Sequence, residues 1–407
     1  MRLVTLFAVT TLSAFGAPAF AATVDVPAGA NAQERLQTAL IDAKPGDTVR
    51  LGAGRFELSE GLSLDVANVT VAGAGEGKTI LAFDGQLGAG DAFLITSSGV
   101  VVSDFTMQNA KGDGVKSKGA DGISLLRLTV EWTGGPKASN GSYGVYPVAS
   151  SNVLIDHVTV RGASDAGIYV GQSRNIVVRN SRAEFNVAGI EIENCYGADV
   201  HDNVATHNAG GILVFDLPGL PQMGGHSTRV FHNEVVNNDT PNFAPRGNIV
   251  AGVPTGTGVM VMANRDIHVF DNHIDGNASA GVMLVAYLQT FTDPRYIPLP
   301  RDIVVRSNRF GRNGFAAVWP GGAEVAAAVG GSLPPVIWDG VDTYTHPGGA
   351  AETIPARLAV SDGPVVNLRL KTQGAPATAA QPTVVPNLIT GDLREPPAIV
   401  LPAGQDR

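Results

Sequence analysis

The chain from Asp113 to Trp319 repeats one pattern of apolar and polar positions, and each repeat begins with a glycine. After the glycine, inward apolar residues alternate with outward ones, a polar turn follows, and a shorter apolar run closes the repeat. The first run appears as Gly114-Val-Lys-Ser-Lys, Gly144-Val-Tyr-Pro-Val, Gly167-Ile-Tyr-Val-Gly, Gly189-Ile-Glu-Ile-Glu, Gly211-Ile-Leu-Val-Phe, Gly258-Val-Met-Val-Met and Gly281-Val-Met-Leu-Val. Four of the steps between these glycines are 22 or 23 residues long. Alternation with a period of two predicts β-strands that bury one face.

Asparagine recurs at two positions of the repeat, after the second strand and again a few residues later. The first set is Asn180, Asn203, Asn233, Asn272 and Asn308, and the second is Asn186, Asn208, Asn238, Asn277 and Asn313. Asparagine tolerates left-handed turn conformations, and its amide can bond to the equivalent amide of the next coil. We therefore predict stacked asparagines at inside corners of the coils.

A unit of this length cannot bury its own apolar face, so the repeats must stack on one another. From about Thr23 to Trp338 the pattern resembles the right-handed parallel β-helix proteins of the pectate-lyase-like superfamily. The resemblance includes an amphipathic opening at 31–43, where the helical spacing of the apolar residues predicts a helix that caps the first coil. We therefore expect an all-β fold, a right-handed parallel β-helix with an N-terminal capping helix. The superfamily contains lyases, hydrolases, epimerases and non-catalytic adhesins, so the resemblance does not select a reaction.

The two ends of the chain differ from the repeat region. Arg2, an apolar run from Leu3 to Phe15 and the small residues before Ala22 predict a secretory signal at 1–21. The apolar run is shorter than the roughly 20 residues that span a bilayer, so we expect a secreted or periplasmic protein without membrane insertion. The β-helix domain is predicted at 22–338. After Asp339 the sequence is rich in Pro, Ala, Gly and Thr, which predicts an extended tail at 339–407.

Composition narrows the class of partner. The formal charge of −9 and the absence of a basic cluster argue against binding to nucleic acid. Cys195 is the only cysteine, which excludes an intrachain disulfide and favours a half-buried structural thiol. No cofactor and no metal site is predicted, and a monomer is expected.

The outward residues of equivalent strands should form columns, with neighbouring strands about 4.8 Å apart. The first column is Lys116, Tyr146, Tyr169, Glu191, Leu213, Met260 and Met283. The second column is Lys118, Val148, Gly171, Glu193, Phe215, Met262 and Val285. Both columns change from polar to apolar between Glu191 and Phe215.

The polar half of these columns carries groups suited to acid–base chemistry on an acidic sugar. Lysine would neutralise a carboxylate, and tyrosine or glutamate would move a proton. The candidate catalytic residues are Lys116, Tyr146, Tyr169, Glu191, Glu193 and Asp165, and the candidate substrate-binding residues are Lys118, Phe215 and Asp216. A solvated face of paired lysines and glutamates is the alternative interpretation.

The apolar half needs a cover, because outward methionines are unusual on a soluble solenoid. Long insertions lie close by in the sequence, at 216–226, 240–254 and 287–301. We expect these loops to fold over the methionines and form one wall of a cleft whose floor is the Tyr/Glu patch.

Three functions follow from these features. The first is an exported enzyme acting on a polysaccharide, a lyase or epimerase on a uronic-acid-containing glycan. Glu191 or Tyr169 would remove the proton next to the sugar carboxylate. Lys116 or Lys118 would stabilise the developing charge, and Tyr146 would assist the leaving oxygen. A hydrolase that uses Glu191 with Asp165 is the variant of this hypothesis.

The second function is a non-catalytic protein of the cell envelope that binds a glycan or another protein. The third is a periplasmic copper-handling accessory protein, since thioethers suit Cu(I) and Met223 and His226 lie on the first insertion. Family signatures do not decide among them. The segment Tyr143-Gly-Val-Tyr-Pro-Val resembles the catalytic segment of mannuronan epimerases only in part, with Tyr146 and Val148 in place of its aspartate and histidine.

Overall fold

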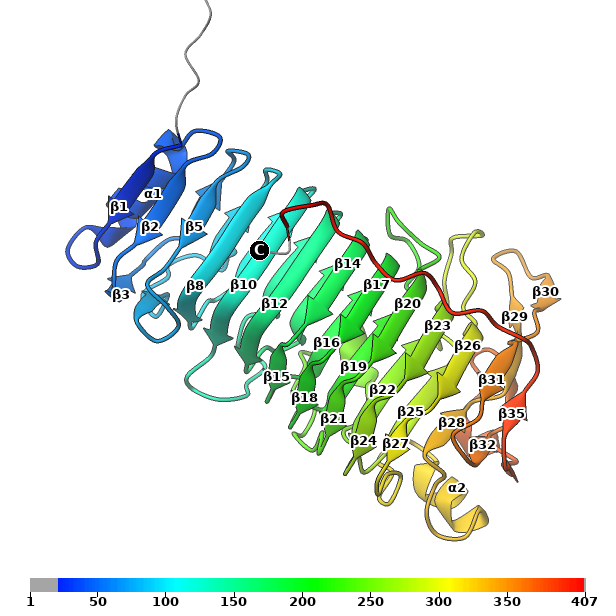
Figure 1. Cartoon of the computed structure of the whole chain (residues 1–407). Helices are drawn as coiled ribbons and strands as arrows, with labels where there is room; N and C mark the ends of the chain where they lie inside the picture. Colours follow the sequence, from blue (N-terminus) through cyan, green and yellow to red (C-terminus); the bar gives the residue numbers. More distant parts are fainter. Residues whose placement is uncertain (1–20, 406–407) are drawn as a thin grey trace, which may run out of the picture.

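A computed structural model describes residues 21–405, which wind into an elongated solenoid of mainly parallel strands (Figure 1). Within these residues the strands form two long sheets, called A and B, and a small sheet C. Sheet B has twelve strands: β4 (Leu62–Leu64), β7 (Phe93–Ile95), β9 (Val115–Lys118), β11 (Tyr143–Val148), β13 (Ala166–Gly171), β16 (Ala188–Glu193), β19 (Gly210–Phe215), β22 (Thr257–Met262), β25 (Ala280–Val285), β28 (Val336–Trp338), β32 (Val365–Asn367) and β34 (Thr383–Val385).

Sheet A has twenty strands in the described chain and forms the remaining sides of the coils. Its strands are β1 (Thr23–Val26), β2 (Thr48–Leu51), β3 (Gly54–Glu57), β5 (Thr70–Ala72), β6 (Thr79–Ala82), β8 (Val100–Gln108), β10 (Asp121–Glu131), β12 (Ser151–Arg161), β14 (Arg174–Arg179), β15 (Arg182–Glu184), β17 (Tyr196–His201), β18 (Val204–Thr206), β20 (His226–Phe231), β21 (Glu234–Val236), β23 (Arg265–Phe270), β24 (His273–Asp275), β26 (Arg301–Arg306), β27 (Arg309–Phe310), β31 (Leu358–Val360) and β35 (Leu388–Ile389). Sheet C contains β29 (Val341–Thr345), β30 (Ala351–Thr353) and β33 (Lys371–Thr372).

The interior of the solenoid is built from the inward positions that the alternation predicts. Ile168, Ile190 and Ile212 lie in register on successive strands of sheet B and are fully buried. Burial of one such side chain contributes about 1.5–3 kcal/mol, so the stacked core stabilises every coil. The right-handed parallel β-helix expected from the sequence is confirmed.

The N-terminal end of the solenoid is covered by helix α1 (Ala32–Asp42). Its buried residues include Leu36, Ala39 and Leu40, which belong to the main core, as the helical spacing predicts. The capping helix is therefore confirmed. Helix α2 (Gly322–Ala328) and the short 3-10 turns η1 (Ile249–Gly252) and η2 (Ala377–Ala379) lie in segments outside the repeat.

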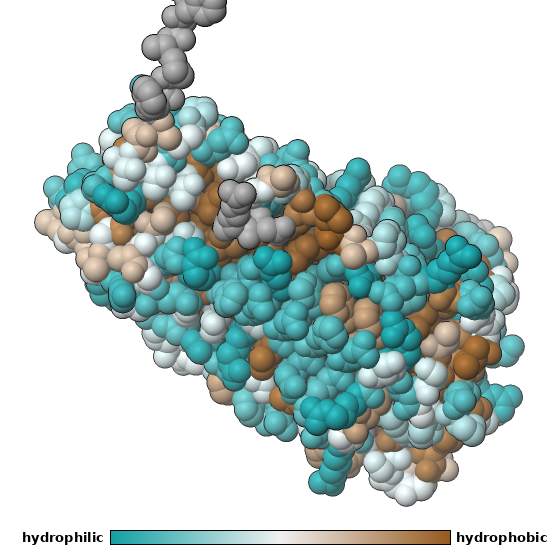
Figure 2. All heavy atoms as spheres, viewed as in Figure 1, coloured by the Kyte–Doolittle hydropathy of each residue, from teal (hydrophilic) through white to brown (hydrophobic). Residues whose placement is uncertain are grey.

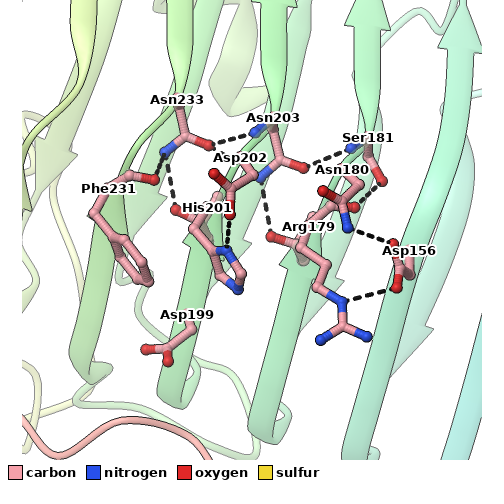
Figure 3. Close-up of polar contacts among 12 residues, drawn as sticks. Asp156, Arg179, Asn180, Ser181, Asp199, His201, Asp202, Asn203, Phe231 and Asn233 are labelled. Atoms are coloured by element: carbon pink, nitrogen blue, oxygen red, sulfur yellow. Dashed lines mark hydrogen bonds and ion pairs between the residues drawn. The ribbon is translucent and has the colours of Figure 1, made fainter. Parts of the chain in front are cut away.

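Two ladders of asparagine side chains run through the corners of the coils. In one, Asn203 donates to Asn233 at 3.0 Å (Figure 3). Asn233 in turn donates to Asn272 at 2.9 Å. In the other, Asn208 donates to Asn238 at 3.0 Å, and Asn186 donates to Asn208 at 3.1 Å. The predicted stacking is thus confirmed at both corners.

The sequence predicts Asn180 as a member of the first ladder because it lies before a turn, but its side chain does not belong to that ladder. Ser181 takes the ladder position, and its backbone N–H donates to the Asn203 side chain at 2.9 Å. Asn180 has a left-handed backbone with φ of 50° and bonds to Asp156 on the outside (Figure 3). Asp202 has φ of 55° directly before Asn203, so the left-handed residue and the ladder residue are neighbours rather than one residue.

The chain after Trp338 differs from the extended tail that the sequence predicts at 339–407. Strands β31 and β32 pair in parallel with β26 and β28, so the solenoid continues past Trp338. Strands β34 and β35 then pair antiparallel with this last coil and close its end. The Pro- and Gly-rich composition hid these strands, because each is only two or three residues long.

Residues 391–405, here called the C-terminal strap, run back along sheet A toward β10 (Figure 1). Glu395 pairs with Arg229 at 2.9 Å and with Arg306 at 2.7 Å. Leu401 is buried against apolar side chains of sheet A, namely Leu126, Leu154 and Val177. This face is mostly hydrophilic, and apolar side chains gather near the end of the strap (Figure 2).

Residues 1–20 of the predicted signal segment at 1–21 lie outside the described residues. Among the described helices, none is both long and apolar enough to cross a membrane.

Candidate active site

The two outward columns of sheet B lie in register as predicted. Tyr146 pairs with Lys116, and Tyr169 pairs with Glu191. Farther along, Glu193 pairs with Phe215 in the neighbouring strand. The polar half and the apolar half therefore meet between β16 and β19.

Lys116 is already paired with two carboxylates. Its Nζ lies 3.0 Å from Asp113 Oδ2, 3.4 Å from Asp91 Oδ1 and 4.6 Å from the centre of the Tyr146 ring. Burial lowers the pKa of Lys116, but the two aspartates outweigh it and the pKa is raised. Burial raises the pKa of Asp113 to about 6, against the opposing effect of Lys116. The lysine charge is therefore neutralised within the protein.

Three tyrosines pack together beside this group. The ring centres of Tyr143 and Tyr146 are 4.5 Å apart, those of Tyr143 and Tyr169 are 4.4 Å apart, and those of Tyr146 and Tyr169 are 4.9 Å apart. The Tyr169 hydroxyl donates to Glu193 Oε1 at 2.7 Å. Burial raises the pKa of Tyr169 well above its ordinary value, so this hydroxyl acts as a hydrogen-bond donor and not as a base.

Asp165, Glu191 and Glu193 are buried close together and are called the carboxyl cluster. Asp165 precedes β13, while Glu191 and Glu193 point outward from β16, the next strand of the sheet. Asn248, on the insertion at 240–254, donates to Asp165 Oδ2 at 2.9 Å. The insertion is thereby held over the polar half of the columns.

Burial raises the proton affinity of every member of the carboxyl cluster. The pKa of Asp165 is raised to about 7 by burial, with Asn248 opposing and the charge of Asp113 adding to it. The pKa of Glu193 is raised to about 7 by burial, against the hydrogen bond from Tyr169. Burial, together with the charges of Asp165 and Glu193, raises the pKa of Glu191 well above its ordinary value.

Glu191 is 1% exposed, and its Oε2 has no hydrogen-bond partner among the described residues. A buried carboxyl group without a full set of partners keeps its proton. Burial therefore favours the protonated form of Glu191, while the pKa values of about 7 place the titration of Asp165 and Glu193 near neutral pH. Such a pair can both donate and accept a proton, as general acid–base catalysis requires.

The methionine half of the columns is covered, and a cavity of about 420 Å³ lies under the cover. Met260, Met262 and Met283 form its floor together with Phe215. The insertions at 240–254 and 287–301 contribute walls as predicted, but the Tyr/Glu patch, which was expected to form the floor, does not line the cavity. The insertion at 216–226 does not line the cavity. It is held at the nearby corner, where Asn194 donates to the carbonyl of Leu217 at 2.8 Å.

Residues 91–244 match the family described as "Right handed beta helix region". The chain is a right-handed parallel β-helix protein. No curated protein matches its sequence.

Several solved structures share the architecture of this β-helix protein. The A-module of a mannuronan C-5 epimerase from Azotobacter vinelandii is 14% identical, with a TM-score of 0.48 over 77% of this chain and 89% of that one. An alginate lyase from Paenibacillus sp. str. FPU-7 is 16% identical, with a TM-score of 0.49 over 72% and 96%. An exopolygalacturonase from Thermotoga maritima is 10% identical, with a TM-score of 0.49 over 91% and 95%. At these identities the likeness concerns the fold alone.

The structure brings together most of the predicted catalytic residues of the β-helix protein. Lys116, Tyr146, Tyr169, Glu191, Glu193 and Asp165 lie on or beside four adjacent strands of sheet B. Lys118 lies on the exposed edge of the same face. Phe215 is fully buried and lines the cavity. These assignments stay predictions.

Asp216 has a structural role. Its carboxylate accepts the backbone N–H groups of Gly224 at 3.0 Å and Gly225 at 2.8 Å, which closes the turn of the first insertion. Cys195 Sγ lies 3.2 Å from the carbonyls of Val170 and Glu193, and burial raises the pKa of its thiol to about 12. The cysteine is a structural thiol, as expected.

Three site residues were missed from the sequence, namely Asp91, Tyr143 and Asn248. Asp113 and Tyr143 directly precede the glycines that begin their strands, and Asp91 holds the equivalent place one coil earlier, before Ala92. Columns read from the glycine onward leave this position out, although its spacing was available. Asn248 lies on an insertion, where no periodicity predicts which side chain reaches the sheet.

The histidine proposed for copper binding lies away from the methionines. The His226 ring stacks on Tyr196, with ring centres 4.6 Å apart, and it does not line the cavity. Across residues 21–405, no group of three or more His, Cys, Asp or Glu side chains is arranged to hold a metal ion.

Proposed function

We propose that this β-helix protein is a glycan-cleaving enzyme, a hydrolase whose acid–base centre is the carboxyl cluster of Asp165, Glu191 and Glu193. The observation that carries the proposal is the burial of three carboxyl groups on neighbouring strands, with the pKa raised to about 7 for Asp165 and Glu193 and raised well above its ordinary value for Glu191. Glycoside hydrolysis commonly uses a pair of carboxyl groups, one protonated and one ionised.

The cost of the carboxyl cluster supports a catalytic use. Burial of polar groups without a full set of hydrogen bonds destabilises a fold, and apolar residues of similar size would be more stable there. Glu191 illustrates this cost, because one of its oxygens is buried without a partner in the described chain. Such costs are typically found at functional sites. Exposed and unperturbed groups would favour a binding protein instead.

The charges around the cluster support hydrolysis of a neutral glycan over a lyase or epimerase reaction. A lyase on a uronic acid needs a cation for the sugar carboxylate and a base for the neighbouring proton. Lys116 is paired with Asp91 and Asp113, and the raised pKa of Tyr169 makes it a poor base. A uronate would also meet several carboxyl groups of its own sign.

The proposed roles follow from the hydrogen bonds. Asp165, held by Asn248, and Glu193, held by Tyr169, each have a pKa of about 7 and so exist in both protonation states near neutral pH. The protonated member donates to the leaving oxygen, and the ionised member activates water or attacks the sugar. Glu191 lies too deep to touch a substrate, and burial with the charges of Asp165 and Glu193 raises its own pKa, so we assign it no direct step. With a signal at 1–21, we place the enzyme in the periplasm or outside the cell.

The test is a screen of the purified protein on neutral and acidic polysaccharides, with separate measurement of reducing ends and of ultraviolet absorbance from unsaturated sugars. We expect new reducing ends without ultraviolet absorbance. Glu193→Gln and Asp165→Asn should each lower kcat by about 100-fold or more, as loss of a general acid or base does.

Glu184→Gln is the matched control. Glu184 is also a buried glutamate, but it lies on sheet A and pairs with Arg161 at 2.5 Å and Arg182 at 2.6 Å. Its activity should equal that of the wild type. Unsaturated products would instead indicate a lyase, and full activity in both cluster variants would remove the cluster from the mechanism.

A further inference from the structure

The cavity over the methionines takes no part in the proposed proton transfers, yet it adjoins the site. Its lining residue Phe215 pairs in register with Glu193 of the carboxyl cluster. Neighbouring strands are about 4.8 Å apart, so one strand spacing separates the cluster from the cavity. A group attached to a sugar at the cluster would reach it.

The walls of the cavity are fixed by hydrogen bonds. Asn242 donates to the carbonyls of Val250 at 2.8 Å and Val253 at 2.9 Å, which holds the insertion at 240–254 in place. Gln373 donates to the carbonyls of Tyr287 at 2.7 Å and Gln289 at 3.0 Å, which ties the C-terminal segment to the next insertion. The cavity therefore exists before any ligand binds, and pre-formed sites bind with less ordering cost.

The cavity is partly open to solvent, so a ligand can enter it from outside. A cavity of roughly 150 Å³ lined by apolar residues accepts benzene, and this one measures about 420 Å³. It has room for a group of about two fused rings.

The lining favours an aromatic ligand. The sulfur-bearing side chains Met260, Met262 and Met283 meet the aromatic residues Phe215 and Trp319 around one space. Thioether sulfur makes favourable contacts with aromatic rings, and methionine adapts its shape to a flat ligand. The aromatic walls add offset-stacked or edge-to-face contacts.

We propose that this cavity binds an aromatic group carried by the glycan substrate, next to the sugar that is cleaved. The inference rests on the proposed function for the identity of the substrate. The aromatic group enters the cavity while its sugar lies over the carboxyl cluster, and binding of the ring selects aryl-substituted glycans over unsubstituted ones.

The first test measures binding without catalysis. The full chain is titrated by calorimetry at pH 6 with 2-naphthol and with decahydro-2-naphthol, which has the same ring skeleton without aromaticity. We expect saturable 1:1 binding of 2-naphthol and about fivefold weaker binding of the saturated alcohol, because sulfur–aromatic contacts are lost.

Two variants on one surface turn locate the binding. Ala377 lines the cavity from η2, whereas Ala379 lies exposed on the same turn. Ala377→Trp should fill the cavity and weaken 2-naphthol binding by at least about tenfold. Ala379→Trp should leave it unchanged. Absence of saturable binding, or equal binding by the two variants, would overturn the site, and tighter binding of decahydro-2-naphthol would overturn its aromatic preference.

A kinetic measurement connects the cavity to the substrate. On a glycan that the enzyme cleaves, the 2-naphthyl glycoside should have a lower KM than the methyl glycoside, and Ala377→Trp should abolish that difference without a change in kcat. If 2-naphthol binds in the cavity but no glycan is cleaved, the proposed function is wrong and the aromatic site stands. If glycans are cleaved but KM does not depend on the aromatic group, the proposed function stands and this inference is wrong.

Discussion

At the scale of single residues, Glu191 is the most deeply buried carboxyl group of the cluster. It points outward from β16, yet neighbouring side chains and the insertion at 240–254 bury it with Asp165 and Glu193. Ordinary outward glutamates are solvated and ionised. This one has a raised pKa because it is buried beside the charges of Asp165 and Glu193, and its ionisation costs the fold stability.

We predict that Glu191→Gln stabilises the protein in a pH-dependent manner. The pKa of Glu191 is raised above its ordinary value of 4.5, so the folded chain holds a proton that the unfolded chain releases above that pH. Stability is therefore full below about pH 4.5 and falls as pH rises through the folded pKa. The glutamine side chain does not titrate. Thermal unfolding should therefore show that the free energy of unfolding of the variant, relative to that of the wild type, rises by on the order of 1–3 kcal/mol from pH 4 to pH 8.

Glu184→Gln serves as the control, because its effect on stability should depend on pH in the opposite direction. Burial would raise the pKa of Glu184, but Arg161 and Arg182 outweigh it and hold the pKa below its ordinary value. Its ion pairs stabilise the fold above the unfolded pKa and are lost as pH falls. The Glu184→Gln variant should therefore be less stable than the wild type at pH 8, and the difference should be small at pH 4. A Glu191→Gln curve parallel to that of Glu184→Gln would contradict the buried, protonated state.

The sequence predicted which side chains share the face but not their ionisation. Alternation with a period of two places Tyr169, Glu191 and Glu193 outward, and this part depends only on strand geometry. The neutralisation of Lys116 depends on Asp91 and Asp113, which lie before the strand, and the burial of Asp165 depends on a loop. The position of a loop depends on tertiary packing, and the periodicity of the sequence carries no information about it.

At the scale of structural elements, the asparagine ladder explains why each repeat begins with glycine. A Cβ on Gly189 would lie 2.8 Å from Asn208 Nδ2 and 2.5 Å from the carbonyl of Gly211. A Cβ on Gly211 would lie 2.8 Å from Asn238 Nδ2. The glycine is required for space, because the amide of the ladder fills the corner beside it. Glycine and asparagine therefore recur together.

We predict that Asn208→Ala strongly destabilises the solenoid. The Asn208 amide donates to Ala183 at 2.9 Å and to Asn238 at 3.0 Å, and its oxygen accepts from Asn186. Removal leaves several buried groups unpaired at about 1–3 kcal/mol each, so the free energy of unfolding should fall by about 3–5 kcal/mol. Urea denaturation followed by circular dichroism measures this loss.

Asn180→Gly is the matched control for the ladder. Asn180 is an asparagine at the corner of the first ladder, but it lies outside that ladder, and glycine accepts its left-handed backbone. The free energy of unfolding of Asn180→Gly should lie within about 0.5 kcal/mol of the wild-type value. Equal losses in both variants would contradict the ladder as the source of stability. From sequence alone the two asparagines look alike, because the turn residue and the ladder residue are adjacent.

At the scale of the whole molecule, the C-terminal strap connects coils that are far apart in the sequence. Glu395 bonds to the β20–β26 region, and the backbone N–H of Ile399 donates to Asp199 at 3.1 Å. Neighbouring coils of a solenoid contact only each other, so an added strap that crosses many coils resists their local separation. Composition predicted an extended segment here, but it could not reveal the surface on which the segment lies.

We predict that Leu401 holds the strap on sheet A and that the neighbouring Val400 does not contribute to its attachment. Leu401 is buried against sheet A, whereas Val400 is 80% exposed. Leu401→Ser removes about 2 kcal/mol of apolar burial, which shifts the local equilibrium toward the detached strap by roughly 30-fold. Limited proteolysis should therefore cleave residues 391–405 from Leu401→Ser much faster than from the wild type, and from Val400→Ser at the wild-type rate. Because cleavage in this regime follows the population of the open form, equal rates in both variants would mean that Leu401 does not hold the strap in solution.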